Sequence, residues 1–357
     1  MKKASKDKDI QGVAAARNGP KITHLFFADD SLLFCKAQKK DCQHIMSILQ
    51  LYEKVSGQKI NMEKSAIYFS SNTKSEDRGM LRQLLKVQAA LEEDRYLGIP
   101  IMIGRDKNRE LRSIKERVKA KIQGWSAKIL SQAGKAVLIQ AVAQSIPIYI
   151  MSCFLLPKGF INEVNMIMSR FWWGDSSRKN KIHWKAWDSL CVSKMDGGLG
   201  FRDFESFNLA LLAKQWWRLV HNEDSLGYRV FKAKYFPFHN PSEAVISPKA
   251  SIIWRSLMKG REVVNSGAVW RVGNGKSINV WNDKWIPHQP SRVPSLLELQ
   301  ILTPIQVCRL IDAEGRKWDE HMIYEMFKKK EDVRIMVIPL SKVVVLDKLI
   351  WERSMTG

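Results

Sequence analysis

Residues 22–34 constrain the fold of this chain more than any other stretch, because two adjacent carboxylates, Asp29 and Asp30, interrupt two runs of strand-forming apolar residues. The apolar runs alternate with a period of two, which predicts a β-hairpin whose strands are at least half buried. In buried strands, two neighbouring negative charges are costly unless a cation is bound. Mg²⁺ prefers oxygen ligands of this kind. A tight turn, which Asp tolerates well, is the alternative interpretation.

The charge of the whole chain indicates a polyanionic partner. Its 357 residues include 58 Lys and Arg against 36 Asp and Glu, which gives a formal net charge of +22. The basic clusters lie in four separate segments, residues 36–40, 105–121, 178–185 and 328–330. Nucleic acid is the commonest partner for such a charge. A membrane surface attracts the same charge, but the clusters do not share one amphipathic helix beside an apolar anchor.

The cysteines and the apolar stretches bear on the cellular environment. Five cysteines without a C-x-x-C pair indicate neither a disulfide framework nor a zinc site. We therefore expect reduced thiols in an intracellular protein, nuclear or cytoplasmic and not secreted. The uncharged stretch between Lys135 and Lys158 is long enough to cross a bilayer, but Pro147 divides it. We expect a buried helix followed by an extended segment there, and no membrane partner.

Apolar residues at helical spacing predict helices at residues 41–56, where Gly57 is the stop signal, and at residues 161–173 and 203–220. Another helix follows Arg105, and its apolar stripe lies opposite a strongly basic face. That face is made of Arg109, Arg112, Lys115, Arg117, Lys119 and Lys121. A solvated face is the alternative, but acidic residues are outnumbered, so phosphate contact is at least as well supported.

The C-terminal half is rich in Gly and Trp. Residues 269–272 and 277–281 predict a hairpin, because the Asn274-Gly275 pair between them is a preferred tight turn. The nearby tryptophans, Trp270, Trp281 and Trp285, suit either a compact core or a nucleic-acid surface. We favour the core.

Several motifs in order along the chain carry a resemblance. From about residue 19 to the end, the sequence resembles plant non-LTR (LINE-type) retrotransposon reverse transcriptases. The matching motifs are Phe27-Ala28-Asp29-Asp30, Ser56-Gly57-Gln58-Lys59-Ile60-Asn61, Tyr96-Leu97-Gly98-Ile99-Pro100, Leu130-Ser131-Gln132-Ala133-Gly134-Lys135, Phe171-Trp172-Trp173-Gly174, Gly197-Gly198-Leu199-Gly200-Phe201 and Trp281-Asn282-Asp283-Lys284-Trp285.

The resemblance implies an α+β fold in which a partial reverse-transcriptase palm, an antiparallel hairpin plus a helix, is followed by a helical thumb and a mixed α/β Trp-rich region. The expected divisions are a disordered lead-in at residues 1–20, the partial palm at 21–104, the thumb at 105–173 and a basic connection region at 174–357. We find no segment that resembles the family's zinc knuckle or ribonuclease H-like domain.

The resemblance also implies roles for residues. Asp29 and Asp30 match two of the metal-binding carboxylates of an RNA-directed DNA polymerase, a nucleotidyltransferase that uses Mg²⁺. Lys64 matches a loop position that protonates pyrophosphate, although an exposed loop lysine explains it equally well. Tyr96, Leu97 and Gly98 match the primer grip. The basic helix face, Arg109, Arg112, Lys115, Lys119 and Lys121, would bind the RNA template and DNA primer.

We find no counterpart of the third, upstream aspartate or of its strand. We therefore expect weak or absent Mg²⁺ binding, no catalysis by this chain alone, and an exposed edge on the hairpin. A partner could supply the missing palm segment in trans. The alternative functions are a noncatalytic nucleic-acid-binding module and the product of a decayed retroelement without selected function.

Overall fold

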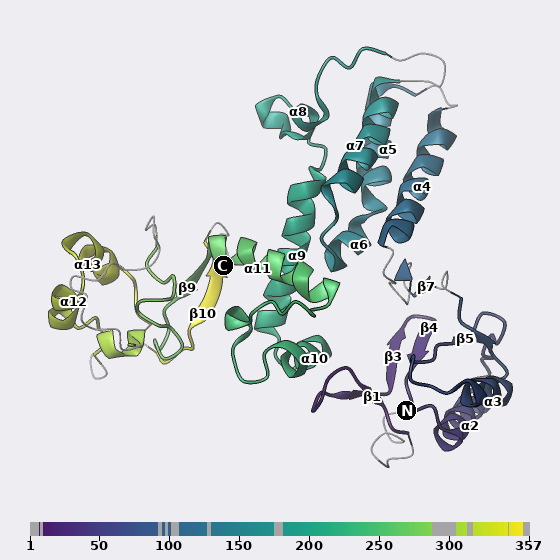
Figure 1. The fold of residues 1–357 in the computed structure, drawn as a ribbon. Coiled ribbons are helices and arrows are strands. Elements are labelled where there is room, and N and C mark those ends of the chain that lie inside the picture. The colour runs from purple at the N-terminus through teal and green to yellow at the C-terminus, as the bar shows by residue number, and fades with distance from the viewer. Residues whose placement is uncertain are drawn as a thin grey trace. The chain divides into compact units, whose positions relative to one another are not determined.

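The computed structural model of the protein describes the following residues: 7, 10–91, 95–96, 99–100, 107–126, 130–174, 181–287, 305–312, 317–341 and 343–352. Helices and small sheets alternate along the chain, which confirms the α+β class (Figure 1). The chain divides into two compact units, residues 1–260 and 261–357, and each unit is described by itself below.

The N-terminal segment, residues 10–91, contains three small sheets. Strands β1 and β2 pair antiparallel, β3 and β4 pair antiparallel, and β5 and β6 pair parallel. The bounds are β1 Val13–Ala14, β2 Lys21–Ile22, β3 His24–Phe27, β4 Asp30–Leu33, β5 Ala66–Ile67 and β6 Gln88–Ala89. Strand β1 and the buried side chain of Ile10 show that the expected disorder at residues 1–20 does not extend through residues 10–20.

Two helices accompany these strands, α2 (Lys39–Ser56) and α3 (Ser75–Leu85). Helix α2 ends as predicted at Gly57, which adopts a left-handed conformation (φ 71°) and donates its N–H to the Glu53 carbonyl. Helix α2 has buried side chains only in its first half. Cys42 and Ile45 are buried, whereas the side chains of Tyr52 and Val55 are 50% and 78% exposed.

A helical bundle follows the short strands β7 (Arg95–Tyr96) and β8 (Ile99–Pro100). Helices α4, α5 and α7 lie side by side in it (Figure 1). Its elements are α4 Lys107–Ser126, α5 Gln132–Ala141, η1 Ala143–Ser145, α6 Ile148–Cys153 and α7 Lys158–Trp173. The expected extended segment after Pro147 is wrong, because α6 begins there. Among the described residues, no helix is both long and apolar enough to cross a membrane.

The core of this bundle continues beyond residue 173, the predicted end of the thumb. Trp187 of α8 (Trp187–Cys191) stacks on Phe201, with ring centroids 5.1 Å apart, and both residues belong to the core. The turn η2 (Lys194–Asp196) lies between them. Helix α9 (Phe204–His221) then adds Phe204, which is fully buried. The helical core therefore includes Trp187, Leu190, Phe201 and Phe204, which lie in the predicted connection region.

Two further helices and a turn complete the first unit, α10 (Leu226–Tyr235), η3 (Pro241–Glu243) and α11 (Ile252–Gly267). Helix α11 contains the division between the two units. The indole of Trp254 is fully buried among aromatic rings and stacks on Tyr235 at a centroid distance of 4.6 Å. This cluster explains why α9, α10 and α11 pack together.

The second unit contains β9 (Ala268–Arg271), η4 (Val307–Leu310), α12 (Glu320–Met326), α13 (Lys329–Met336) and β10 (Lys348–Trp351). The predicted hairpin is wrong, because β9 pairs with β10 and not with residues 277–281. The tryptophan prediction is confirmed for Trp285. Its ring is fully buried, and its Nε1 donates to the Val280 carbonyl at 3.0 Å. Trp270 and Trp281 are partly buried against the same core.

Candidate nucleic-acid interface

The acidic hairpin forms as predicted, but it lacks the predicted burial. Phe27 pairs with Asp30, which leaves a two-residue turn of Ala28 and Asp29. Ala28 has a φ of 50°, a left-handed conformation that a non-glycine residue adopts at some cost. The side chains of Phe26 and Phe27 are 57% and 59% exposed, and both carboxylates are exposed. The expectation that the strands are at least half buried is therefore wrong at the end that carries the acids.

This hairpin does not form a complete divalent-metal site within the described residues. No group of three or more His, Cys, Asp and Glu side chains lies together there. Two exposed carboxylates lack the ligand number and the rigid surroundings that position a metal for catalysis. The part of the chain that the structure describes also contains no third strand paired with β3 or β4. The exposed hairpin edge stays a prediction.

The other predicted palm residues are only partly described. Lys64 is exposed on a loop, and its backbone N–H donates to the Asn61 side chain at 3.0 Å, as in an Asx turn. Tyr96 is half-buried on β7, while Leu97 and Gly98 lie outside the described residues. The catalytic and primer-gripping roles of these residues stay predictions.

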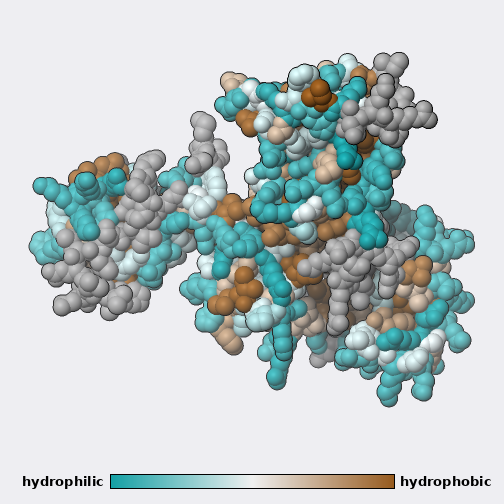
Figure 2. Space-filling view, turned by 45° about the horizontal axis from the view of Figure 1, so that its top comes forward, coloured by the Kyte–Doolittle hydropathy of each residue, from teal (hydrophilic) through white to brown (hydrophobic). Residues whose placement is uncertain are grey.

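Helix α4 carries the predicted basic face on a firmly anchored backbone. Ile114, Val118 and Ile122 are at most 8% exposed and belong to the bundle core, so the opposite face points away from it. Arg112, Arg117, Lys119 and Lys121 are exposed on that face, and Lys115 is half-buried. The side chain of Arg109 lies outside the described residues. Hydrophilic residues cover most of the bundle surface visible in Figure 2.

Ion pairs divide this basic face. Lys115 lies 2.7 Å from Glu163 of α7, and Lys119 lies 4.0 Å from Glu116. Among the described residues, no carboxylate lies within 4 Å of Arg112, Arg117 or Lys121. These three cations are therefore the part of the face best placed for phosphate contact, whereas Lys115 is also a packing residue between α4 and α7.

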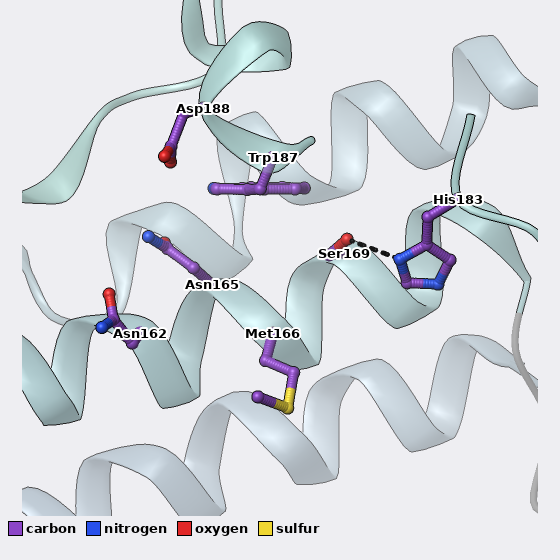
Figure 3. A pocket seen from close by; sticks show the side chains of 7 residues that line it. All are labelled: Asn162, Asn165, Met166, Ser169, His183, Trp187 and Asp188. Carbon is purple, nitrogen blue, oxygen red and sulfur yellow. Dashed lines mark hydrogen bonds between the residues drawn. The ribbon is translucent and has the colours of Figure 1, made fainter. Parts of the chain in front are cut away.

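The α7–α8 pocket, a shallow cavity of about 240 Å³, lies on the same bundle (Figure 3). Its polar lining combines the amides of Asn162 and Asn165, the hydroxyl of Ser169, the imidazole of His183 and the carboxylate of Asp188. The His183 ring lies 3.5 Å from Ser169 through Nδ1 and stacks on Trp173 with centroids 5.9 Å apart. Sequence reasoning missed this pocket, because its lining comes from two helices and a loop.

A pair of lysines at the end of α7 was also missed. A Cβ placed on Gly174 would lie 3.3 Å from the ammonium groups of both Lys135 and Lys181. Lys135 donates to the Trp172 carbonyl at 3.4 Å, a favourable position because a helix C-terminus carries partial negative charge. Burial and then the charge of Lys181 lower the pKa of Lys135. The only sequence signals were the Leu130–Lys135 motif and the basic cluster 178–185.

Comparisons with other proteins bear on this interface. No protein-family model matches the chain. The chain is 34% identical over 269 residues to an Arabidopsis thaliana protein named "Putative ribonuclease H protein At1g65750", a match that covers 72% of this chain and 42% of that protein. It thus spans about two fifths of this longer relative.

A second relative from Arabidopsis thaliana is matched over nearly its whole length. The chain is 43% identical over 143 residues to the "Uncharacterized mitochondrial protein AtMg00310", covering 40% of this chain and 93% of that protein. Identity at this level over almost the full length of a relative indicates a common fold and descent. The chain therefore belongs to the family of the mitochondrial protein AtMg00310.

Proposed function

We propose that this chain is a nucleic-acid-binding piece of a plant non-LTR retrotransposon reverse transcriptase that does not polymerise DNA by itself. The observation that carries the proposal is the basic face of α4, where Arg112, Arg117 and Lys121 are exposed without a described carboxylate partner. The ordered motifs resembling this family support it, as does the name of the longer relative, since ribonuclease H acts on nucleic acid.

Catalysis by this chain alone is not part of the proposal. Template-directed polymerisation needs metal ions held by a rigid set of carboxylates. In the described residues, Asp29 lies on the turn and Asp30 begins β4, both are exposed, and no group of three or more metal-ligating side chains lies together. We expect weak Mg²⁺ binding there. Ribonuclease H activity is not part of the proposal either.

The binding proposal is tested by salt dependence. Fluorescence anisotropy with a 20-nucleotide RNA and a 20-nucleotide DNA, repeated from 50 to 300 mM salt, should show affinity falling steeply as salt rises. Replacing Arg112, Arg117 and Lys121 together by Gln should lower the logarithmic salt slope by about 1 for each of these cations that neutralises a phosphate in the wild-type complex.

A matched triple variant controls for net charge. Lys54, Lys59 and Lys74 are exposed in the N-terminal segment, so replacing them by Gln removes the same charge elsewhere. Equal losses of affinity in both triple variants would show that α4 has no special part in binding. If the affinity of the wild-type chain does not change with salt concentration, the proposed function is refuted. Primer extension with Mg²⁺ on an RNA template tests inactivity. Incorporation that disappears in Asp29→Ala would overturn it.

A further inference from the structure

An exposed segment lies in the chain between α7 and α8. Residues 181–185, the sequence Lys-Ile-His-Trp-Lys, are all exposed. The indole of Trp184 is 77% exposed and the side chain of Ile182 is 69% exposed, although tryptophan is normally among the more buried residues. Cationic residues interleaved with an exposed aromatic ring are typical of surfaces that bind unpaired nucleotides, because every base offers a face for stacking.

The lysine pair at the end of α7 gives this segment an anion-binding character. The ammonium groups of Lys135 and Lys181 approach the same point beside Gly174, so their charges repel. Burial first, and then the charge of Lys181, lower the pKa of Lys135. An anion held near both groups would interact favourably with both charges. A phosphate of a nucleic-acid backbone has the right charge and can accept hydrogen bonds from both side chains.

His183 of the same segment lines the α7–α8 pocket, and Trp184 follows it in the chain. The Asp188 carboxylate repels phosphate, and the amides of Asn162 and Asn165 combine donors with acceptors, as the edge of a base does. Two buried atoms at this pocket, Asn165 Oδ1 and Trp187 Nε1, have no hydrogen-bond partner among the described residues. A flat heterocycle with polar edges therefore suits the pocket better than an apolar chain.

We infer that residues 181–185, with Lys135 and the α7–α8 pocket, form a binding site for an unpaired stretch of nucleic acid. A base stacks on Trp184, a neighbouring phosphate lies between Lys135 and Lys181, and the edge of a base faces Asn162, Asn165 and Asp188. The site rests on the proposed nucleic-acid binding but is separate from the α4 face. A duplex does not suit it, because paired bases present no free face for stacking.

The test uses the full chain with two fluorescent probes, a 20-nucleotide oligo-dT strand and a 20-base-pair duplex. Trp184→Ala should weaken binding of the single strand about tenfold, the effect of losing one stacked base, and leave binding of the duplex within about twofold. Trp184→Phe should keep most of the affinity, whereas Trp184→Leu should not, because leucine keeps apolar area without an aromatic face.

Phe238→Ala is the matched control. Phe238 is 89% exposed in the same unit and belongs to neither the segment nor the pocket, so its removal should change neither affinity. Replacing Lys135 and Lys181 by Gln should lower the salt slope for the single strand by about 1 to 2. Equal circular dichroism and thermal melting of all variants would show that they are folded.

The outcomes separate this site from the proposed function. If Trp184→Ala leaves single-strand affinity unchanged while the α4 triple variant loses it, the site is refuted and the proposed function stands. If the wild-type chain binds neither probe in a salt-dependent way, both are refuted. If Trp184→Ala reduces binding to vesicles of phosphatidylserine and phosphatidylcholine but not to the oligonucleotide, the segment is a membrane surface and the inference is wrong.

Discussion

The segment that carries the acidic hairpin and the helical bundle that carries the basic surfaces differ most in how they are packed. In residues 10–91, the buried apolar side chains are only Ile10, Cys42, Ile45 and Leu81. The bundle, in contrast, has one continuous core from Leu111 to Phe204. The motif that resembles a catalytic centre therefore lies on the weakly packed part, and the cationic surfaces lie on the firmly packed part.

This difference separates positioning from attraction. A catalytic metal site needs carboxylates held in a fixed geometry by neighbouring packing. Asp29 lies on the hairpin turn and Asp30 begins β4, next to exposed Phe26 and Phe27, so little within the described residues holds the two carboxylates. Binding a polyanion depends mainly on clustered positive charge, which the exposed side chains of helix α4 provide. The comparison predicts that the two parts respond differently to mutation, chemical labelling and charge removal.

The largest expected effect is on the stability of the bundle. Asn208 of α9 is 1% exposed, accepts from the Leu156 N–H at 2.8 Å and donates to the carbonyls of Met151 and Phe154. Asn208→Ala would leave two buried backbone groups and one partly buried group unpaired, so it should lower the unfolding free energy by about 3 kcal/mol. Urea unfolding followed by helical circular dichroism measures this change.

Two control variants sharpen that prediction. Asn162→Ala removes an exposed asparagine from α7 and should cost less than about 0.5 kcal/mol, as should Phe27→Ala in the hairpin. If Phe27→Ala lowers the unfolding free energy by several kcal/mol, the hairpin is well packed. The proposed difference in packing between residues 10–91 and the helical bundle would then be wrong.

Local signals in the sequence predicted the elements whose structure depends on local chemistry. The stripe Leu111, Ile114, Val118 and Ile122 predicted α4, and Gly57 predicted the end of α2. The burial of a strand depends on what lies against it, so the sequence alternation at Phe26 and Phe27 was misleading.

Contacts distant in sequence also overrode local turn chemistry in the second unit. The Gly273-Asn274-Gly275 turn does not form the expected hairpin, because the carboxylate of Asp347 accepts the backbone N–H groups of Gly273, Gly275 and Ser277 at 2.8 to 2.9 Å. The same long-range approach lets β10 pair with β9. Gly273 is required there, since a Cβ would lie 2.5 Å from the Leu346 carbonyl oxygen. The α7–α8 pocket, assembled from separate elements, was equally beyond local patterns.

A smaller effect concerns cysteine reactivity, which reports on both parts. Burial, followed by the charges of Asp203 and Asp188, raises the pKa of Cys191 in the bundle to about 12. In the N-terminal segment, a thiol hydrogen bond lowers the pKa of Cys42 and raises that of Cys35. At pH 8, iodoacetamide should label the Cys35–Cys42 pair at least tenfold faster than Cys191, because thiolates react and weakly packed regions open more readily.

Peptide mass spectrometry over time measures this order, and labelling in 8 M urea, where all three thiols should react alike, is the control. Faster labelling of Cys191 would contradict the proposed difference in packing. The sign of the pH dependence follows as well. The folded bundle holds the Cys191 proton more tightly than the unfolded chain, so this contribution to stability is present below pH 9.0 and is lost as the pH rises toward 12.

The smallest expected effect tests whether the ion pair between α4 and α7 restrains the basic face. Glu163→Gln removes the partner of Lys115, an exposed carboxylate, so stability should fall by less than about 1 kcal/mol. The freed ammonium group can then contact phosphate. Affinity for nucleic acid should rise a few-fold, with a salt slope steeper by about 1. Glu205→Gln is the matched control, because it breaks the Lys158 ion pair, also 2.7 Å long, with the same change in net charge.

If both variants raise affinity equally, the gain comes from net charge alone and Lys115 does not face the ligand. If only Glu163→Gln raises it, the α4 face is the surface that nucleic acid contacts, and Glu163 limits how strongly that face binds.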